Sequence, residues 1–367
     1  MTASGKPTLL VAGGGTGGHV LAGVAIAQAW RQKFGADAPV VFVGARGKIE
    51  EKLVPREGFP LRLLDLGSLN RVSVSRKLKT YFQLPWSFIV SLRVLLSERP
   101  SAVIGVGGYA SGPVVLMAGV FSWLVGARTA LLEQNSVPGM TNRILARFVR
   151  TVFLAFDLAR LPQGNQYFAP EKLRVTGNPI RNSLSQLPSA ARDPFVVFIF
   201  GGSQGAHGIN TLVLSALPHL KDKPIQFIHQ TGEKDFDRVS RGYQAAGIAN
   251  ARVEKFIYEM PAAYRASSLI ICRSGSSTMA EIAAVGRAAI FIPLPTAADN
   301  HQEWNARLFA DAGAARLVHQ EQTSGEDLAR MIEEFRANPA EISRIEQKVR
   351  DYHRPDAARD IVDAITT

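Results

Sequence analysis

Short apolar segments alternate with longer amphipathic ones along this chain. Apolar runs bounded by glycine, proline or charged residues predict buried strands, and the segments between them predict helices. The expected strands are Thr8–Ala12, Val40–Val43, Arg62–Asp65, Ala102–Val106, Thr129–Leu132, Phe195–Phe200, Gln226–Gln230, Val253–Phe256, Leu269–Cys272 and Ala289–Ile292. Helices are expected at Leu21–Phe34 and Ser277–Val285, among others. Strands that alternate with helices are typical of parallel sheets, so the pattern predicts an α/β fold.

The pattern starts again near residue 195, after a break at Gly177–Pro179 and a polar segment at Ser183–Asp193. A chain of 367 residues also exceeds what one hydrophobic core usually supports. We therefore expect two Rossmann-like domains that face a central cleft. The stretch Ile342–Ile365 reads as helical. The expected divisions are residues 1–178, residues 179–345, and a C-terminal helix in 346–367 that packs back on the first domain.

One uncharged segment, from Ser101 to Ala127, is long enough in principle to cross a bilayer. Its first half is interrupted by glycines and by Pro113. A strand, a glycine loop and a buried helix at Val114–Val125 explain the segment better than a transmembrane helix does.

A second segment, Arg71–Arg93, mixes basic side chains with apolar and aromatic ones. This mixture suits shallow docking on anionic lipid. The candidate membrane contacts are Leu78, Lys79, Phe82 and Trp86. An ordinary helix with an apolar core face and a basic solvent face fits the same residues equally well.

Charge is divided unevenly along the chain. Residues 1–180 hold 21 Lys and Arg against 9 Asp and Glu, whereas residues 181–367 hold 21 against 22. The excess in the first half predicts that this domain faces an anionic partner. The single cysteine, Cys272, excludes an internal disulfide framework and is expected to pack in the core. The N-terminal apolar run is too short for a signal peptide, which predicts a cytosolic protein.

Two glycine-rich loops each follow an expected strand and open an expected helix. They read Gly13-Gly14-Gly15-Thr16-Gly17-Gly18-His19 and Gly201-Gly202-Ser203-Gln204-Gly205-Ala206-His207. Glycine lets backbone N–H groups approach phosphate oxygens, and the following helix presents the positive end of its dipole. Both loops are therefore candidate phosphate sites.

Each loop alone also fits another class of enzyme. The first matches the dinucleotide fingerprint G-x-G-x-x-G, but the second strand ends in Val43–Arg46 without the acidic residue that a dehydrogenase needs. The second matches the nucleophile elbow G-x-S-x-G, with His301 or His319 as nominal partner, but a serine hydrolase leaves the first loop unexplained. Two substrates held in one cleft, a nucleotide diphosphate and an acceptor, explain both loops.

Two further clusters favour that interpretation. Cys272–Thr278 is a loop of small residues before a helix that carries Glu281, a carboxylate suited to ribose hydroxyls. Asp299–Gln302 follows a proline-rich strand exit and offers amide and imidazole groups to sugar hydroxyls.

At these residues the chain resembles the MurG family of bacterial glycosyltransferases along essentially its whole length. The resemblance rests on ordered motifs, which are GGGTGGHV at 13–20, GVGGYASGP at 105–113, EQNSVPGMTNRILAR at 133–147, GNPIR at 177–181, GGSQGAHGIN at 201–210, HQTG at 229–232, RSGSSTMAEIAAVG at 273–286 and DNHQEWNA at 299–306. It implies a GT-B fold and an inverting transfer of N-acetylglucosamine from UDP-GlcNAc to the muramyl 4-hydroxyl of lipid I, which completes lipid II for peptidoglycan. Ala22 stands where many relatives have proline, and 296–298 is less polar than usual.

The resemblance also implies roles for individual residues. On the donor side, Arg181 and Ser203 would meet the diphosphate, Ser276, Ser277 and Thr278 the α-phosphate, Phe256 and Ile257 the uracil, Glu281 the ribose, and His301 and Gln302 the sugar. The acceptor side would be lined by Thr16, Gly17, Gly18, His19, Tyr109 and Asn135, together with Glu133.

Inversion requires a base for the attacking hydroxyl and support for the leaving diphosphate. His19 is the candidate base because imidazole titrates near neutral pH, and Glu133 is the alternative. His19 equally suits helix capping or acceptor binding. No D-x-D-like acidic cluster stands in a suitable loop, so no obligatory metal or cofactor is expected, and Arg181 with helix-terminal amides would stabilise the diphosphate.

The expected partners are UDP-GlcNAc, lipid I, anionic membrane lipid, and other cell-wall synthesis or division proteins. The expected location is peripheral, on the cytoplasmic face of the bacterial inner membrane. A related lipid-acceptor transferase and a catalytically inactive cell-wall scaffold are the alternatives. No nucleic-acid-binding motif accompanies the basic half.

Overall fold

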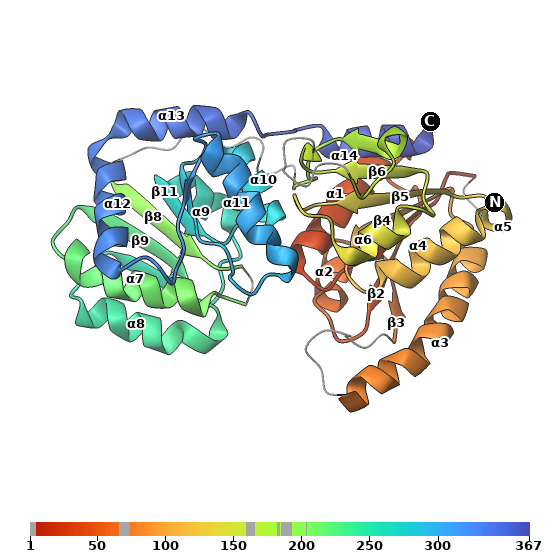
Figure 1. The fold of residues 1–367 in the computed structure, drawn as a ribbon, viewed down its shortest axis with the longest axis horizontal. Coiled ribbons are helices and arrows are strands. Elements are labelled where there is room, and N and C mark those ends of the chain that lie inside the picture. The colour runs from red at the N-terminus through yellow and green to blue at the C-terminus, as the bar shows by residue number, and fades with distance from the viewer. Residues whose placement is uncertain (1–4, 66–73, 159–165, 182–183, 185–192, 203) are drawn as a thin grey trace. The chain divides into compact units, whose positions relative to one another are not determined.

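The chain folds into two compact units, of which unit 1 comprises Met1–Arg181 with Arg354–Thr367 and unit 2 comprises Asn182–His353. The computed structural model describes all residues except 1–4, 66–73, 159–165, 182–183, 185–192 and 203, and it leaves the side chains of 74–84 undescribed (Figure 1). The chain therefore leaves unit 1 after Arg181, rather than after residue 178, and returns at Arg354, rather than after residue 345.

Unit 1 is built on a parallel sheet of seven described strands in the order β3-β2-β1-β4-β5-β6-β7. The strands are β1 Leu9–Gly13, β2 Val40–Ala45, β3 Leu61–Leu64, β4 Ala102–Gly107, β5 Arg128–Glu133, β6 Thr151–Leu154 and β7 Leu173–Val175. The helices are α1 Gly17–Phe34, α2 Glu50–Arg56, α3 Val74–Glu98, α4 Ser111–Val120, α5 Ser122–Val125, α6 Met140–Leu145 and α14 Ala357–Thr366, with a 3-10 turn at Pro170–Lys172.

Helices cover both faces of this sheet, which is why its strands β1, β2 and β4 are apolar throughout rather than alternating. Successive side chains of a strand point to opposite faces. Leu9 and Val11 therefore join the core under α1 and α14, whereas Leu10 and Ala12 join the core under α3, α4 and α6. Figure 1 shows α14, the last helix, lying beside α1 in unit 1.

Unit 2 repeats the plan with a parallel sheet of six described strands in the order β10-β9-β8-β11-β12-β13. The strands are β8 Phe195–Phe200, β9 Ile225–Gln230, β10 Ala251–Glu254, β11 Leu269–Cys272, β12 Ala289–Phe291 and β13 Arg316–Leu317. The helices are α7 His207–Leu220, α8 Phe236–Ala245, α9 Met260–Ala266, α10 Ser276–Val285, α11 His301–Asp311, α12 Gly325–Ala337 and α13 Pro339–Arg350, with 3-10 turns at Glu233–Asp235 and Ala298–Asn300.

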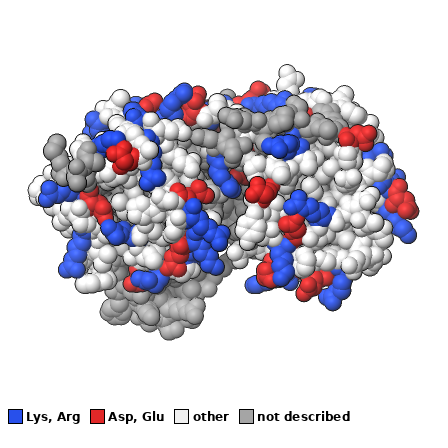
Figure 2. Space-filling view, turned by 180° about the vertical axis from the view of Figure 1, so that it is seen from behind, with Lys and Arg blue, Asp and Glu red and all other residues white. Residues whose placement is uncertain are grey.

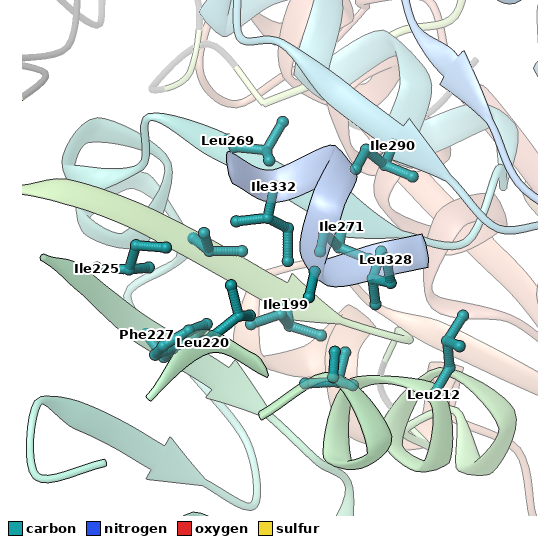
Figure 3. Close-up of a cluster of buried hydrophobic side chains, with 14 of the residues drawn as sticks. Ile199, Leu212, Leu220, Ile225, Phe227, Leu269, Ile271, Ile290, Leu328 and Ile332 are labelled. Atoms are coloured by element: carbon teal, nitrogen blue, oxygen red, sulfur yellow. The ribbon is translucent and has the colours of Figure 1, made fainter. Parts of the chain in front are cut away.

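One hydrophobic core of unit 2 lies between its sheet and the pair α7 and α12. Figure 3 shows Ile199 and Ile271 of the sheet gathered with Leu212 of α7 and with Leu328 and Ile332 of α12. Each of these side chains is buried. The two Rossmann-like sheets confirm the predicted fold class.

Three sequence-based expectations about elements are wrong in detail. The strand expected at Val253–Phe256 is Ala251–Glu254, because its register on β9 pairs Ala251 with Phe227 and ends at Glu254. The buried helix expected at Val114–Val125 is two helices, of which α5 buries no residue. The long helix expected at Ile342–Ile365 is broken before Pro355, since proline disfavours a helical residue ahead of it.

Candidate functional site

In each unit the strand order reverses between two central strands, β1 and β4 in unit 1 and β8 and β11 in unit 2. Open parallel sheets bind ligands at this switch point, outside the carboxyl ends of the strands. Both glycine loops predicted from the sequence begin there. Each unit therefore offers one candidate site.

The unit 1 loops touch each other directly. Gly14 N–H donates to the Gly107 carbonyl (3.0 Å), and a Cβ on Gly108 would lie 2.2 Å from the Gly14 carbonyl oxygen. Gly14, Gly107 and Gly108 all have positive φ, of 152°, 100° and 84°. Only glycine fits this approach of two backbones, which fixes the loops after β1 and β4 as one surface.

Glu50, which the sequence analysis did not select, binds the backbone of the first glycine loop and of the end of β2. Its buried carboxylate accepts the N–H of Gly15 (2.8 Å) and the N–H of Ala45 (3.0 Å). A Cβ on Gly14 would lie 2.3 Å from its Cδ atom. The signal in the sequence was an acidic residue shortly after the strand that ends at Ala45, at the start of α2.

His19 lies in the first turn of α1, against the β4 loop. Its Nδ1 is 3.1 Å from the Gly14 carbonyl oxygen, which only accepts, so Nδ1 carries the proton and Nε2 is the basic nitrogen. A Cβ on Gly107 would lie 2.9 Å from Nε2, so the ring packs directly over that glycine. Thr16 caps the helix by accepting the His19 N–H (3.4 Å).

Glu133, at the end of β5, is buried and bound to its own loop. Its carboxylate accepts the N–H of Asn135 (2.9 Å), the N–H of Gly139 (3.0 Å) and the Nδ2 of Asn142 (2.8 Å). Burial raises the pKa of this carboxyl, and the hydrogen bonds oppose that rise. The arrangement makes Glu133 an anchor for the loop 134–139.

The other expected acceptor-side residues lie on the same loops of unit 1. Thr16, Gly17 and Gly18 form the start of α1, Tyr109 follows β4 with its side chain partly exposed, and Asn135 follows β5. The structure thus brings His19, Glu133 and these residues to the carboxyl ends of the central strands β1, β4 and β5.

In unit 2, the central loops open α7 and α10 without a side-chain cap at Ala206 or Gly275. Uncapped amino ends of helices suit anions, because their N–H groups and dipoles are directed at the ligand. Ser276, Ser277 and Thr278 form the first turn of α10. Ser203, the expected diphosphate contact, lies outside the described residues.

A second residue that the sequence analysis did not select, Gln230, links two of these segments. Its buried side chain donates to the Gly202 carbonyl (2.9 Å) and accepts the Ile257 N–H (2.8 Å). It thereby joins the glycine loop to Phe256 and Ile257, the expected uracil contacts. Phe256 is partly exposed and packs edge-on against Tyr258. The HQTG motif was visible in the sequence, but its role was not.

Glu281 lies in the second turn of α10. Its Oε2 accepts the hydroxyl of Tyr264 (2.8 Å), a residue of α9 that the sequence analysis also did not select. Arg273 binds the protein's own backbone, because it donates to the carbonyls of Ile292 and Pro293. Burial lowers its pKa to about 10. Cys272 is buried with a raised pKa, as expected of a core cysteine.

The loop before α11 is strained. Asp299 and Asn300 both have positive φ, 49° and 53°, which L-residues rarely adopt in succession. His301 Nδ1 lies 2.7 Å from the Ala298 carbonyl, and Gln302 accepts the Leu294 N–H (3.0 Å). Backbone strain of this kind is concentrated at functional sites.

Arg181 is the last residue of the first segment of unit 1. Its buried Nε has no hydrogen-bond partner among the described residues.

Exposed apolar side chains gather on neighbouring helices of unit 1. Trp86 of α3 is 56% exposed, with the Arg93 guanidinium 5.7 Å from its ring centroid, and Trp123 of α5 is 78% exposed. The others on these helices are Ile89, Leu96, Val120, Leu124, Met140 and Ile144, and Phe148 follows α6. We call this set, with Trp86 and Trp123, the apolar surface. Leu78, Lys79 and Phe82 belong to α3, but their side chains lie outside the description.

Within the described part of the chain, no helix is long and apolar enough to cross a membrane. Within that same part, no three His, Cys, Asp or Glu side chains are grouped so as to hold a metal ion.

Comparison with known proteins gives full-length matches. Residues 9–154 match the glycosyltransferase family 28 N-terminal domain, and residues 196–361 match the C-terminal domain of that family. A protein of Myxococcus xanthus named UDP-N-acetylglucosamine–N-acetylmuramyl-(pentapeptide) pyrophosphoryl-undecaprenol N-acetylglucosamine transferase is 43% identical, over 97% of this chain and 91% of its own. A protein of the same name from Syntrophus aciditrophicus is 42% identical, over 97% of each chain.

Solved structures are similar as well. Acinetobacter baumannii MurG superposes with a TM-score of 0.76 and 30% identity, over 98% of this chain and 99% of that one. The UDP-GlcNAc 2-epimerase of Neisseria meningitidis, bound to UDP-GlcNAc, gives a TM-score of 0.70 over 97% and 98%. Its identity is 15%, so it supports the fold alone.

Proposed function

From the premise that this chain belongs to glycosyltransferase family 28, and within it to the MurG family, we propose that it transfers N-acetylglucosamine from UDP-GlcNAc to the muramyl 4-hydroxyl of lipid I. The product is lipid II. The observation that carries this proposal is that relatives of that name match nearly the whole chain, through both switch-point sites. Apart from Arg181, the proposed donor residues belong to unit 2, and the proposed acceptor residues belong to unit 1.

In the donor site, the diphosphate binds the amino ends of α7 and α10. The uncapped starts of these helices supply N–H groups, and Arg181 adds a guanidinium. Ser203 and the first turn of α10 complete the phosphate contacts. Phe256 and Ile257 bind the uracil, Glu281 the ribose, and His301 and Gln302 the sugar hydroxyls.

In the reaction, the acceptor 4-hydroxyl oxygen bonds to C1 of the donor sugar while the bond from C1 to the diphosphate oxygen breaks. UDP departs with the bonding electrons, and the configuration at C1 inverts. Arg181 and the helix amides stabilise the charge that develops on UDP. The proton of the hydroxyl passes to a base in unit 1.

We assign that base to His19 rather than Glu133. The hydrogen bond from Nδ1 to Gly14 leaves Nε2 as the basic nitrogen, whereas three donors already bind the Glu133 carboxylate. Glu133 then serves the reaction by holding the loop that carries Asn135. Thr16, Gly17, Gly18 and Tyr109 bind the acceptor around the base.

Turnover of UDP-GlcNAc with a short-chain lipid I analogue tests the proposal. We expect product with the native chain, and a fall in kcat of at least ~100-fold for His19→Ala at saturating substrates. Glu133→Gln, which preserves the shape of the anchor, should reduce kcat less. A near-normal kcat for His19→Ala would mean that another residue acts as the base. UDP binding without any turnover would favour the inactive scaffold.

We further propose a peripheral location on the cytoplasmic face of the bacterial inner membrane. The lipid tail of the acceptor requires access to a bilayer, and the apolar surface beside basic side chains suits anionic lipid. Leu78, Lys79 and Phe82 would extend this contact along α3 from Trp86. Other cell-wall synthesis or division proteins are the proposed protein partners.

A further inference from the structure

We propose that Tyr264 is a positioning residue for Glu281, and that this pair makes the donor site select ribonucleotides over 2′-deoxyribonucleotides. The inference rests on the proposed function, in which Glu281 accepts the ribose hydroxyls. It adds to that assignment a positioning residue and a selectivity for the 2′-hydroxyl. Tyr264 contacts Glu281 and, in the proposal, no substrate atom.

The hydroxyl of Tyr264 is fixed in space by the ring that carries it. Tyr264 is fully buried, at 0% exposure. Its ring stands edge-on to Phe198 and to Phe200 of β8, with centroids 5.7 and 5.9 Å apart and interplanar angles of 80° and 84°. Close packing against both phenyl rings restricts the orientation of the tyrosine ring, so the hydroxyl stays directed at Glu281 Oε2, 2.8 Å away.

The backbone of Tyr264 is held as firmly as its ring. Its carbonyl oxygen accepts the Ser267 hydroxyl (2.8 Å) and the Arg287 Nε–H (3.3 Å). Ser267 and Arg287 are themselves fully buried. The donor to Glu281 is thus anchored at both ends, through α9 and through the sheet.

Glu281 needs such an anchor. A glutamate has three rotatable side-chain bonds, and an unrestrained carboxylate loses more conformational entropy when it binds a ligand. An ionised carboxylate has about four acceptor positions, and the Tyr264 hydroxyl occupies one of them. In the proposed function the two ribose hydroxyls, both of which can donate, bind the carboxylate that the Tyr264 hydroxyl holds.

This geometry predicts selectivity at the 2′ position. Hydrogen bonds to a charged acceptor are stronger than neutral ones, and a donor nucleotide that lacks the 2′-hydroxyl leaves part of the carboxylate unpaired. A site built to bind a substrate hydroxyl rejects the analogue that lacks it. Loosening Glu281 should weaken this discrimination without altering contacts to the base or the phosphates.

Calorimetric titration of the full chain with UDP and with 2′-deoxy-UDP tests the inference. We expect the native protein to prefer UDP at least ~10-fold, from one charged hydrogen bond. Tyr264→Phe, which removes only the hydroxyl, should cut this preference by a factor of about 3 to 10. Its affinity for 2′-deoxy-UDP, which keeps the 3′-hydroxyl, should fall by a smaller factor, and Glu281→Gln should show the same pattern.

Tyr243→Phe is the matched control. Tyr243 is 2% exposed in the same unit, packs against Phe227, and its hydroxyl bonds to His229 Nδ1 (3.2 Å) rather than to Glu281. Loss of the Tyr243 hydroxyl should lower the stability of unit 2 about as much as Tyr264→Phe does. It should leave the preference for UDP intact. Equal weakening of both nucleotides by Tyr264→Phe, or a Tyr243→Phe variant that loses the preference as well, would overturn the inference and leave Tyr264 a merely structural role.

Different binding results would contradict the selectivity of Tyr264 and Glu281 and the proposed transfer reaction. If the native chain binds UDP without any preference over 2′-deoxy-UDP, the ribose role of Glu281 and the inference are both wrong, while the transfer reaction stands. If it binds neither nucleotide, the proposed function itself is contradicted. In steady-state kinetics, Tyr264→Phe should raise the donor KM while the acceptor KM stays unchanged.

Discussion

Two buried carboxylates at the strand ends of unit 1 bind the protein's own backbone. Glu50 accepts two loop N–H groups and Glu133 accepts two more, besides the amide of Asn142. Carboxylates at such positions are easily read as catalytic or ligand-binding groups. Here each shapes a loop, and the imidazole of His19 contacts the first of these loops.

Glu50→Gln should loosen the first glycine loop. The substitution keeps the side-chain volume, but it places an amide N–H against the N–H of Gly15 or Ala45. We expect unit 1 to lose about 1–3 kcal/mol of stability and the acceptor KM to rise several-fold, with the donor KM unchanged. Denaturant unfolding and steady-state kinetics measure both. Glu51→Gln, on the same helix, is the control, and equal effects from the two variants would contradict the role of Glu50.

His229 makes the stability of unit 2 depend on pH. Burial lowers its pKa to about 3, and its neutral ring bonds to Tyr243 and Asn210. The unfolded chain binds a proton below its ordinary pKa of about 6.5, whereas the folded chain does not, so folding free energy is lost as pH falls through that value. Between pH 7 and 4.5 this loss is about 2–3 kcal/mol.

His229→Gln should therefore lose less stability on acidification than the native chain, by about that amount. Urea denaturation of both proteins at pH 7 and 4.5 gives the difference. His219→Gln removes an exposed histidine of α7 and should behave like the native chain. Parallel losses in the native and His229→Gln proteins would refute the assignment.

At the scale of elements, the sequence was most informative where strands are fully buried. The runs at Phe195–Phe200 and Leu269–Cys272 were predicted without error, because a strand covered on both faces is apolar at every position. Edge strands carry less of this signal. The strands β7 and β13, at the ends of their sheets, were missed, and β10 was displaced.

The same limit applies to the site. Glycine loops were visible because the backbone conformation demands glycine at Gly14 and Gly107. Gln230, Glu50 and Tyr264 were missed, because each acts on a segment far away in sequence. A hydrogen bond between distant segments leaves no periodicity or spacing in the chain.

Two exposed tryptophans, one on α3 and one on α5, allow a direct test of the apolar surface. Trp123→Ser and Trp86→Ser each remove an exposed aromatic side chain from unit 1. We expect each to weaken binding to vesicles that contain anionic lipid about five- to tenfold, a change of ~1–1.4 kcal/mol. Co-sedimentation with vesicles measures it, and added salt should weaken binding further. Tyr258→Ser removes a 72% exposed aromatic from unit 2 and should have no effect, so equal losses would argue against this surface.

At the scale of the whole molecule, the two units differ in charge more than in architecture. The positive excess lies in the first 180 residues, the half that holds the proposed acceptor site. Figure 2 shows basic and acidic side chains interspersed with uncharged areas on the face that it displays, so charge is not gathered into one block there. Any attraction to anionic lipid therefore acts together with the apolar surface.

The stability of unit 1 also depends on α14, the C-terminal helix. Ile361, Val362 and Ile365 of α14 are buried in the same core as Trp30. Ile361→Ala should destabilise unit 1 by about 2–5 kcal/mol and leave UDP binding in unit 2 unchanged. Hydrogen exchange, followed by peptides from each sheet, separates the two units. Asp360→Ala, at an exposed position of α14, is the control, and equal deprotection of both sheets would contradict this division.

The return of the chain to unit 1 sets an order of events during synthesis. At ~5–20 residues per second, a ribosome needs roughly 10–40 s after Arg181 to reach the end of α14. Through that interval α1 lacks the helix that covers its apolar side. Unit 2 is continuous in sequence, so its elements are all made before those of unit 1 are complete. The unit that begins first on the ribosome is therefore the last that can finish folding.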